Sequence, residues 1–193
     1  LGTVRGMSIE ARVGQPYGTF FGQGFARDPS GNIIYDKSGY PTLNPTRRIL
    51  GNFTSKWIGG FQNTFSYKGI TLSTLIDVKQ GGDIFSQTVN IGRYTGVLAE
   101  TVVGRETGIV GDGVVNTGTA TEPVYVPNAT KISSEEWHKK YYALTNNEAT
   151  IFDGSFVKLR EVKLSYTFSG QVFKKLPFRD LTISAVGRNL LLL

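Results

Sequence analysis

The sequence GNFTSKWIGGFQNTFSYKGITLSTLIDVKQGG, residues 51–82, decides the fold of this chain. From position 57 its odd positions are mainly aromatic, and the even positions between them are mainly polar. Side chains of a β-strand point alternately to its two faces, so one face of this segment is aromatic. The segment therefore predicts a strand with one apolar side. The aromatic positions are Trp57, Phe61, Phe65 and Tyr67.

A second alternating run begins at Ile70, directly after a predicted two-residue turn at Lys68-Gly69. Folding the two runs on this turn places apolar residues opposite apolar ones, and a shift by one residue would destroy the match. Each strand has about ten residues, enough to cross a bilayer at the tilt of a barrel strand. The predicted pairs are Tyr67 with Ile70, Phe65 with Leu72, Asn63 with Thr74, Phe61 with Ile76, Ser66 with Thr71, Thr64 with Ser73 and Gly60 with Asp77.

A second hairpin is predicted near the end of the chain. Residues 162–168 alternate between apolar and polar, and a return strand covers 181–185. The parity of the apolar positions changes at Arg160-Glu161, which predicts either a β-bulge or a strand that leaves the membrane at this point. The connection, 169–180, contains a kink at Lys174-Lys175-Leu176-Pro177. We expect one face of both hairpins to contact lipid and the other to line an interior. The lipid-facing set is Trp57, Phe61, Phe65, Leu72, Ile76, Leu164 and Ile183, and the interior set is Gln62, Thr64, Ser73, Asp77 and Lys163.

Residues 81–153 form a predicted long loop between the hairpins. The segment has no sustained periodicity, and one short helix is predicted at 133–137, where Ser133 caps and Glu136 completes a capping box. The strand directions place the loop opposite the Lys68-Gly69 turn. Short turns on one side and long loops on the extracellular side are typical of an outer-membrane barrel. The sequence thus predicts an all-β fold, an antiparallel transmembrane β-barrel with long extracellular loops.

The first fifty residues predict only short elements. Alternation over 7–13 predicts a strand, and turn clusters at 28–32 and 36–41 flank a short strand at 33–35. The chain begins on a strand pattern and stops within an apolar run, 190–193. We therefore expect all of 1–193 to be one part of a larger barrel.

The composition of the chain excludes several kinds of functional site. Of the 193 residues, 24 are Gly and none is Cys, which excludes disulfides, thiolate metal sites and cysteine nucleophiles. The net charge is +6, but Lys and Arg are scattered, so no nucleic-acid partner is predicted. No stretch reaches the roughly 18 apolar residues of a membrane helix.

No catalytic or cofactor signal is present in the sequence. His138 is the only histidine, which excludes a histidine metal cluster, and its setting beside Lys139 and Lys140 favours an ordinary surface residue. Asp28 and Asp36 lie in turn clusters, where Asp is common, and do not indicate a glycosidase pair. The chain is therefore not expected to be an enzyme, and neither a cofactor nor a bound metal is predicted.

Three aromatic residues in the long loop are the candidate binding residues: Trp137, Tyr141 and Tyr142. They are expected to be exposed, where they could stack on sugars or anchor a partner. The alternative is that they pack the loop onto itself.

Several blocks of the sequence, in order, resemble the SusC/RagA family of TonB-linked outer-membrane transporters. The matching blocks are VGQPYGTFFG at 13–22, RILGN at 48–52, GGFQNTFSYKG at 59–69, SFVKLREV at 155–162 and GRNL at 187–190. Together they extend over nearly the whole chain. Many members carry an acidic, calcium-like loop before the LGN block, but here residues 36–41 contain one carboxylate, so a plain turn is expected.

This resemblance implies the architecture and the partners of a transporter. The chain would be the C-terminal part of a roughly 22-stranded barrel. A plug would fill the barrel and a SusD-like surface lipoprotein would cap it. TonB would contact the missing N-terminal part and drive import of a glycan or peptide ligand through the outer membrane of a Gram-negative, Bacteroidetes-type cell. The rival interpretation is a soluble β-sandwich that binds carbohydrate or protein, with the apolar face covered by a second sheet. Trp57 and Tyr67, at the two ends of the first strand like the aromatic girdles of a barrel, favour the membrane.

Overall fold

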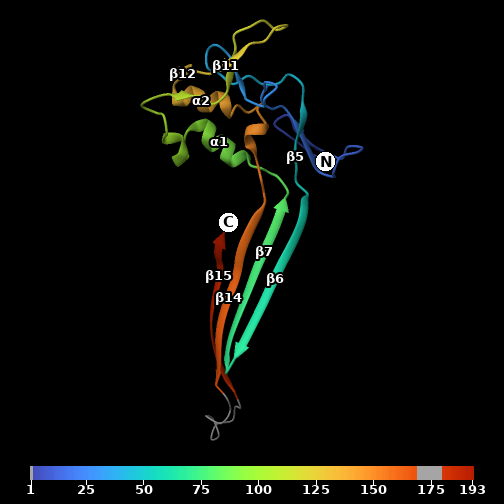
Figure 1. Cartoon of the computed structure of the whole chain (residues 1–193), viewed down its shortest axis with the longest axis vertical. Coiled ribbons are helices and arrows are strands. Elements are labelled where there is room, and N and C mark those ends of the chain that lie inside the picture. The colour runs from blue at the N-terminus through green and yellow to red at the C-terminus, as the bar shows by residue number, and fades with distance from the viewer. Residues whose placement is uncertain (1, 169–179) are drawn as a thin grey trace. The chain divides into compact units, whose positions relative to one another are not determined.

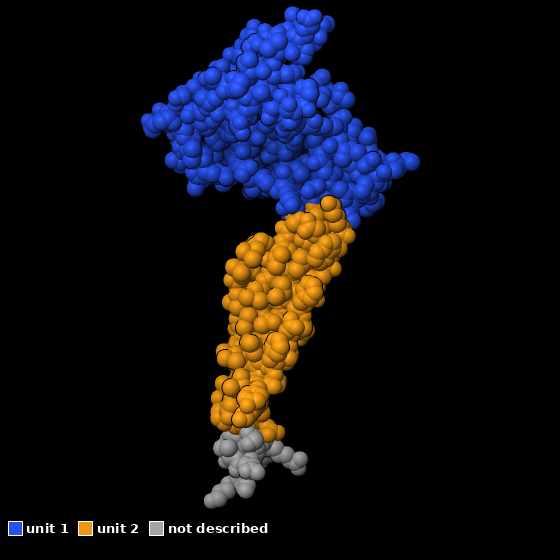
Figure 2. Space-filling view, in the orientation of Figure 1, with its two compact units in different colours: residues 1–54, 83–153 blue, residues 55–82, 154–193 orange. Residues whose placement is uncertain are grey.

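The computed structural model describes residues 2–168 and 180–193, which form two compact units (Figures 1 and 2). Unit 1 comprises residues 1–54 and 83–153, and unit 2 comprises residues 55–82 and 154–193. Strands are the main regular structure of the chain, and the described residues include two short α-helices.

Unit 2 is one antiparallel sheet of four long strands in the order β15-β14-β7-β6 (Figure 1). The strands are β6 (Ser55–Tyr67), β7 (Ile70–Gly81), β14 (Phe156–Phe168) and β15 (Leu181–Leu192). All seven residue pairs predicted for the first hairpin are confirmed. Lys68 and Gly69 both have positive φ, 45° and 82°, which is the backbone of a type I′ turn. A Cβ at position 69 would lie 2.8 Å from the carbonyl oxygen of Thr167, so glycine fits there for space as well.

The predicted bulge is also confirmed. The register of β14 shifts between Leu159 and Glu161 against both of its neighbours, β7 and β15, so Arg160 is the extra residue. The bulge allows apolar side chains on both sides of it, such as Leu159 and Val162, to remain on one face despite the change of parity. The second hairpin pairs antiparallel as predicted, but the kink at 174–177 lies outside the described residues.

The two faces of the unit 2 sheet differ in chemistry. Residues paired across antiparallel strands point to the same side, so the register gives each row directly. Phe65 pairs with Leu72, which pairs with Leu164, and Phe61 pairs with Ile76. These apolar rows share one face. The opposite face contains rows such as Thr64, Ser73 and Lys163, and Ser66, Thr71 and Ser165.

Unit 1 is built from short strands. One sheet has the order β1-β2-β3-β5, and a second has the order β11-β10-β4, in which β10 and β4 run parallel. Two strand pairs, β12-β9 and β13-β8, complete the described sheets of the unit. The strands are β1 (Gly2–Val4), β2 (Met7–Glu10), β3 (Thr19–Gly22), β4 (Ile34–Tyr35), β5 (Arg48–Asn52), β8 (Ile84–Phe85), β9 (Ile109–Val110), β10 (Val114–Asn116), β11 (Tyr125–Pro127), β12 (Lys131–Ile132) and β13 (Ile151–Phe152).

The helices of unit 1 all lie in its second segment. They are α1 (Gln87–Thr95), α2 (Ser134–Tyr141) and two 3₁₀ turns, η1 (Ala99–Val102) and η2 (Glu148–Thr150). Residues 81–153, predicted as a loop with one helix, thus contain two α-helices and several strands. The sequence pattern missed α1, because its nine residues include no acidic first turn and no continuous apolar stripe.

The core of unit 1 joins its two segments. Its buried apolar side chains include Met7, Phe20, Phe25, Tyr35 and Val115. Tyr35 is 2% exposed, and a Cβ at Gly111 would lie 2.2 Å from its ring. The aromatic ring of the first segment therefore packs directly on the backbone of the second, and glycine at 111 permits that approach.

Candidate functional site

The candidate site is built around α2, whose first turn is held by the predicted cap. The Oγ of Ser133 accepts a hydrogen bond from the Glu136 amide at 3.2 Å. The Ser133 hydroxyl also donates to Oε2 of Glu136 at 3.0 Å, so this carboxylate meets the capping hydroxyl instead of the backbone amide of a full capping box. Glu135 pairs with Lys139 one turn later, at 2.5 Å. The cap is confirmed, and the helix extends to Tyr141, beyond the predicted end.

The three candidate aromatic residues lie together at the end of α2. They are half-buried, not exposed as expected. The rings of Trp137 and Tyr141 are stacked with centroids 4.6 Å apart, and Tyr142 lies edge-on to Tyr141 at 5.0 Å. Tyr141 also contacts Phe25, from the first segment of unit 1, at 4.6 Å. Burial raises the pKa of both Tyr141 and Tyr142 above its ordinary value. Their mutual packing limits the part of each ring that a ligand could reach.

His138 is buried, so the prediction of a surface histidine is wrong. Its side chain is 7% exposed, and Nδ1 lies 2.8 Å from the carbonyl oxygen of Ser134 one turn earlier. A carbonyl oxygen only accepts hydrogen bonds, so this contact assigns the proton of the neutral ring to Nδ1. Nε2 then carries the lone pair, and it makes no hydrogen bond within the described residues. The flanking lysines suggested a surface position because they lie on other sides of the same helix.

Two cavities adjoin this part of unit 1. The larger, which we call the Arg105 cavity, has a volume of about 610 Å³, and the smaller, the Trp137 cavity, about 300 Å³. His138 lines both, and Trp137 and Tyr142 line the smaller one. Tyr141 lines neither. The Arg105 cavity is lined by Tyr94, Thr95, Gly96, Thr101, Arg105, Ser133, Ser134, Glu135, His138 and Lys139.

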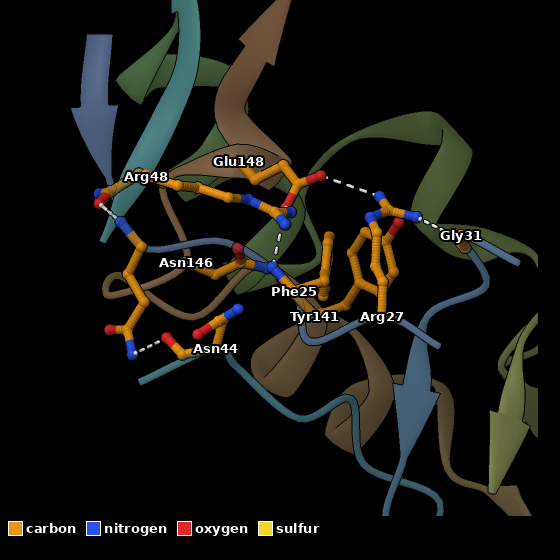
Figure 3. A network of polar contacts seen from close by, with 10 residues as sticks. Phe25, Arg27, Gly31, Asn44, Arg48, Tyr141, Asn146 and Glu148 are labelled. Atoms are coloured by element: carbon orange, nitrogen blue, oxygen red, sulfur yellow. Dashed lines mark hydrogen bonds and ion pairs between the residues drawn. The ribbon is translucent and has the colours of Figure 1, made fainter. Parts of the chain in front are cut away.

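A carboxylate from η2 holds the two segments of unit 1 together (Figure 3). Glu148 accepts hydrogen bonds of 2.8 Å from Arg27, from Arg48 and from the backbone amide of Phe25. Burial raises the pKa of Glu148, but the hydrogen bonds from Arg27, the Phe25 amide and Arg48 outweigh it, so the pKa lies below its ordinary value. The charged carboxylate is thus part of the scaffold that positions α2.

The turn at residues 36–41 has the plain structure expected of it. Oδ1 of Asp36 accepts hydrogen bonds from the amides of Ser38 and Tyr40, which closes the turn. Among the described residues, no group of three or more His, Cys, Asp or Glu side chains gathers in a way that could hold a metal ion.

Three residues of this region could not be recognised from the sequence: Arg105, Glu148 and, as a buried residue, His138. Their partners lie on other elements, and Glu148 is 121 positions from Arg27. The sequence GRETG at 104–108, in which two glycines flank Arg105, is only a weak indication of a functional arginine.

Comparison with known proteins finds similar sequences and a similar fold. No family model matches the chain. Two proteins of Formosa agariphila align with most of it: TonB-dependent receptor P3, 22% identical over 165 residues, and TonB-dependent receptor P39, 25% identical over 151 residues. The solved structure of the RagAB peptide importer in its closed-closed state covers 100% of the chain, with a TM-score of 0.57 and 16% identity. The chain is thus similar in sequence to TonB-dependent receptors and in fold to the RagAB importer, in agreement with the predicted SusC/RagA-type resemblance.

The chain spans only a small part of the length of these proteins. It covers 14% and 13% of the two curated relatives, although the alignments include 85% and 77% of this chain. It covers 21% of the solved chain. The predicted resemblance is confirmed, and so is an all-β fold like that of the solved importer. Within the described residues, no helix combines the length and apolar character needed to cross a membrane.

Proposed function

We propose that this chain forms part of the wall and loops of an outer-membrane barrel that imports oligosaccharides or peptides with energy from TonB. The observation that carries this proposal is the unit 2 sheet. Its four strands have 12 or 13 residues each, more than the roughly 9–11 that a tilted strand needs to cross a bilayer. One of its faces is apolar and open over that length.

The exposure of the apolar face supports lipid as its neighbour. Phe61 is 58% exposed and Phe65 is 67% exposed, and Leu164 and Ile183 are exposed as well. Soluble proteins rarely leave so continuous an apolar surface in water. A β-sandwich would cover it with a second sheet, and the described residues of unit 2 form one sheet alone. This favours the barrel over the rival interpretation.

The opposite face of the sheet is polar, as expected for the water-filled interior of a barrel. Asp77 pairs with Arg160, and Glu161 pairs with Arg188 at 3.0 Å. Hydroxyl pairs link the strands between them, such as Thr64 with Ser73 at 3.2 Å. Ion pairs and hydroxyls on one side and exposed aromatic rings on the other are the pattern of a strand between a polar lumen and lipid.

We further propose that residues 83–153 lie on the extracellular side, where a SusD-like lipoprotein and the ligand would meet the barrel. The chain leaves the sheet at the end of β7 and returns at the start of β14, at the end opposite the Lys68-Gly69 turn. The aromatic cluster of Trp137, Tyr141 and Tyr142 is the part of this segment suited to contact a partner or a ligand. Loops held on a rigid scaffold are a common place for recognition.

The test uses the complete transporter in its own cell. Membrane fractionation should place it in the outer membrane, and uptake of the cargo should stop when TonB is inactivated. Trp137→Ala should weaken uptake or retention of the lipoprotein without reducing the amount of assembled barrel. A transporter recovered from the soluble fraction, or uptake unchanged without TonB, would contradict the proposal. Val97→Ala, an exposed apolar position outside both cavities, is the matched control.

A further inference from the structure

The Arg105 cavity contains a cation that has no carboxylate partner. In the described residues, the ion pairs nearby are closed: Arg93 with Glu100 and Lys139 with Glu135. Arg105 takes part in none of them. The lining therefore contains two cations and one carboxylate, and that carboxylate is already paired with one of the two. The unpaired charge of the cavity is the Arg105 guanidinium.

The guanidinium is held in a fixed orientation by neutral groups. Nη2 donates to the carbonyl oxygen of Gly96 at 2.5 Å, and Nε donates to the carbonyl oxygen of Thr101 at 3.2 Å. Gly96 is the C-cap of α1, so this edge of Arg105 serves the helix end. That structural role accounts for Nε and Nη2 but not for Nη1, which has no hydrogen-bond partner in the described part of the chain. Nε and Nη2 fix the orientation of the guanidinium, so Nη1 can donate to an anion without a further loss of side-chain freedom.

The second polar group is an acceptor. Because Nδ1 of His138 donates to the Ser134 carbonyl, the neutral ring has its lone pair on Nε2. That nitrogen of the neutral ring can accept a hydrogen bond from a hydroxyl group. The lining thus suits a ligand that carries two different groups, an anion for Arg105 and a hydroxyl for His138.

The serine and threonine hydroxyls of the lining offer no further donor, because each already donates a hydrogen bond within the protein. The hydroxyl of Thr101 donates to Leu98, that of Thr95 to Ile91 and that of Ser134 to Val103. Ser133 caps α2. Tyr94, which also lines the cavity, supplies an aromatic side chain. The volume of about 610 Å³ is within the roughly 300–1,000 Å³ of small-molecule sites.

We propose that the Arg105 cavity binds an acidic sugar, a uronate unit that presents its carboxylate to Arg105 and a ring hydroxyl to Nε2 of His138. The proposal rests on the import function in one respect, since it makes an acidic glycan the cargo or part of it. Binding itself is independent of transport. A transporter that binds the sugar but does not import it would contradict the proposed function and leave the site intact.

The test is equilibrium binding of small sugars to the purified, full-length transporter in detergent. The first comparison needs no variant: D-glucuronate against D-glucose and against neutral D-glucuronamide. Glucuronate should bind at least about tenfold more tightly than either neutral sugar, as expected for a charge-assisted hydrogen bond to arginine. Equal affinities for the three sugars, or no binding of glucuronate up to millimolar concentrations, would overturn the proposal.

Variants then locate the site. Arg105→Met keeps the apolar stem and removes the charge, so glucuronate affinity should fall about tenfold while glucose affinity stays the same. Arg105→Lys should lie between the two, because lysine keeps the charge but lacks the planar fork. His138→Asn retains a donor in the position of Nδ1 and loses Nε2, so it should weaken glucuronate several-fold.

The control is Lys37→Ala, which removes one exposed positive charge of unit 1 that does not line the cavity, and which should leave binding unchanged. Each variant should match the wild type in its limited-proteolysis pattern. Glucuronate affinity that Arg105→Met leaves unchanged would contradict the site. Triglutamate that binds as tightly as glucuronate would contradict the hydroxyl requirement and indicate a peptide ligand instead.

Discussion

Replacing Phe61 by arginine tests the orientation of the sheet, and the structure sets the expected magnitude. Phe61 is the middle residue of the 13 in β6. A strand rises about 3.3 Å per residue, and at a barrel tilt of about 40° this gives roughly 2.5 Å of depth per residue. If β6 spans the bilayer, Phe61 lies near the midplane, and Phe65 lies about 10 Å away, close to the edge of the apolar band.

The expected cost therefore depends on depth and on face. Phe61→Arg should lower the free energy of unfolding by about 2–4 kcal/mol, whereas Phe65→Arg should cost about 0–1 kcal/mol. Gln62→Arg, one residue away on the polar face, is the matched control and should cost little. The assay is a guanidinium titration of the complete transporter in phospholipid vesicles, followed by fluorescence. Equal losses for Phe61→Arg and Gln62→Arg would refute the assignment of faces.

Two further predictions concern unit 1, both measured by hydrogen exchange of the intact transporter. Glu148→Gln should lower the protection of residues 23–48 by about 1–3 kcal/mol, because Arg27 and Arg48 lose their charged acceptor. Since the folded pKa of Glu148 lies below 4.5, wild-type protection should be complete above about pH 4.5 and should fall as the pH drops through the folded pKa, whereas the variant should show a flatter profile. Gly111→Ala should destabilise unit 1 by about 1–3 kcal/mol, because the new methyl group meets the buried Tyr35 ring, and Gly2→Ala, with nothing within 4 Å, should not; unchanged protection in Gly111→Ala would contradict the packing described.

Much of the unit 2 sheet was predictable from the sequence, namely the register of the first hairpin, the second hairpin and the bulge. Its strands are long enough for alternation to be read over many residues, and a two-residue turn leaves one sensible register. The change of parity at Arg160 even located the bulge. Information of this kind is local, because the two strands of each hairpin are close in the chain, whereas the pairing of β7 with β14 joins distant segments and was not predicted.

Unit 1 was not predictable to the same degree, for a physical reason. Many of its strands have two or three residues, too few to show a period, and they are held by contacts between distant segments. The ring of Tyr35 packs on Gly111, and Glu148 accepts a hydrogen bond from Arg27. Neither contact can be predicted from the residues next to it in the sequence. The burial of His138 follows from the same kind of contact. The candidate aromatic residues were found because they cluster within one helical turn and a half, but their half-buried packing depends on partners such as Phe25.

The central claim, that one face of the unit 2 sheet contacts lipid, has a direct test because this chain contains no cysteine. Single substitutions along β6, from Ile58→Cys through Phe61→Cys and Gln62→Cys to Phe65→Cys, would be made in a transporter otherwise free of cysteine. Each would be labelled in native membranes with a water-soluble maleimide and with a lipid-soluble one. We expect strict alternation, in which Phe61→Cys and Phe65→Cys react with the lipid-soluble reagent and Gln62→Cys and Thr64→Cys react with the water-soluble one. Labelling of neighbouring positions by the same reagent, without a period of two, would contradict it.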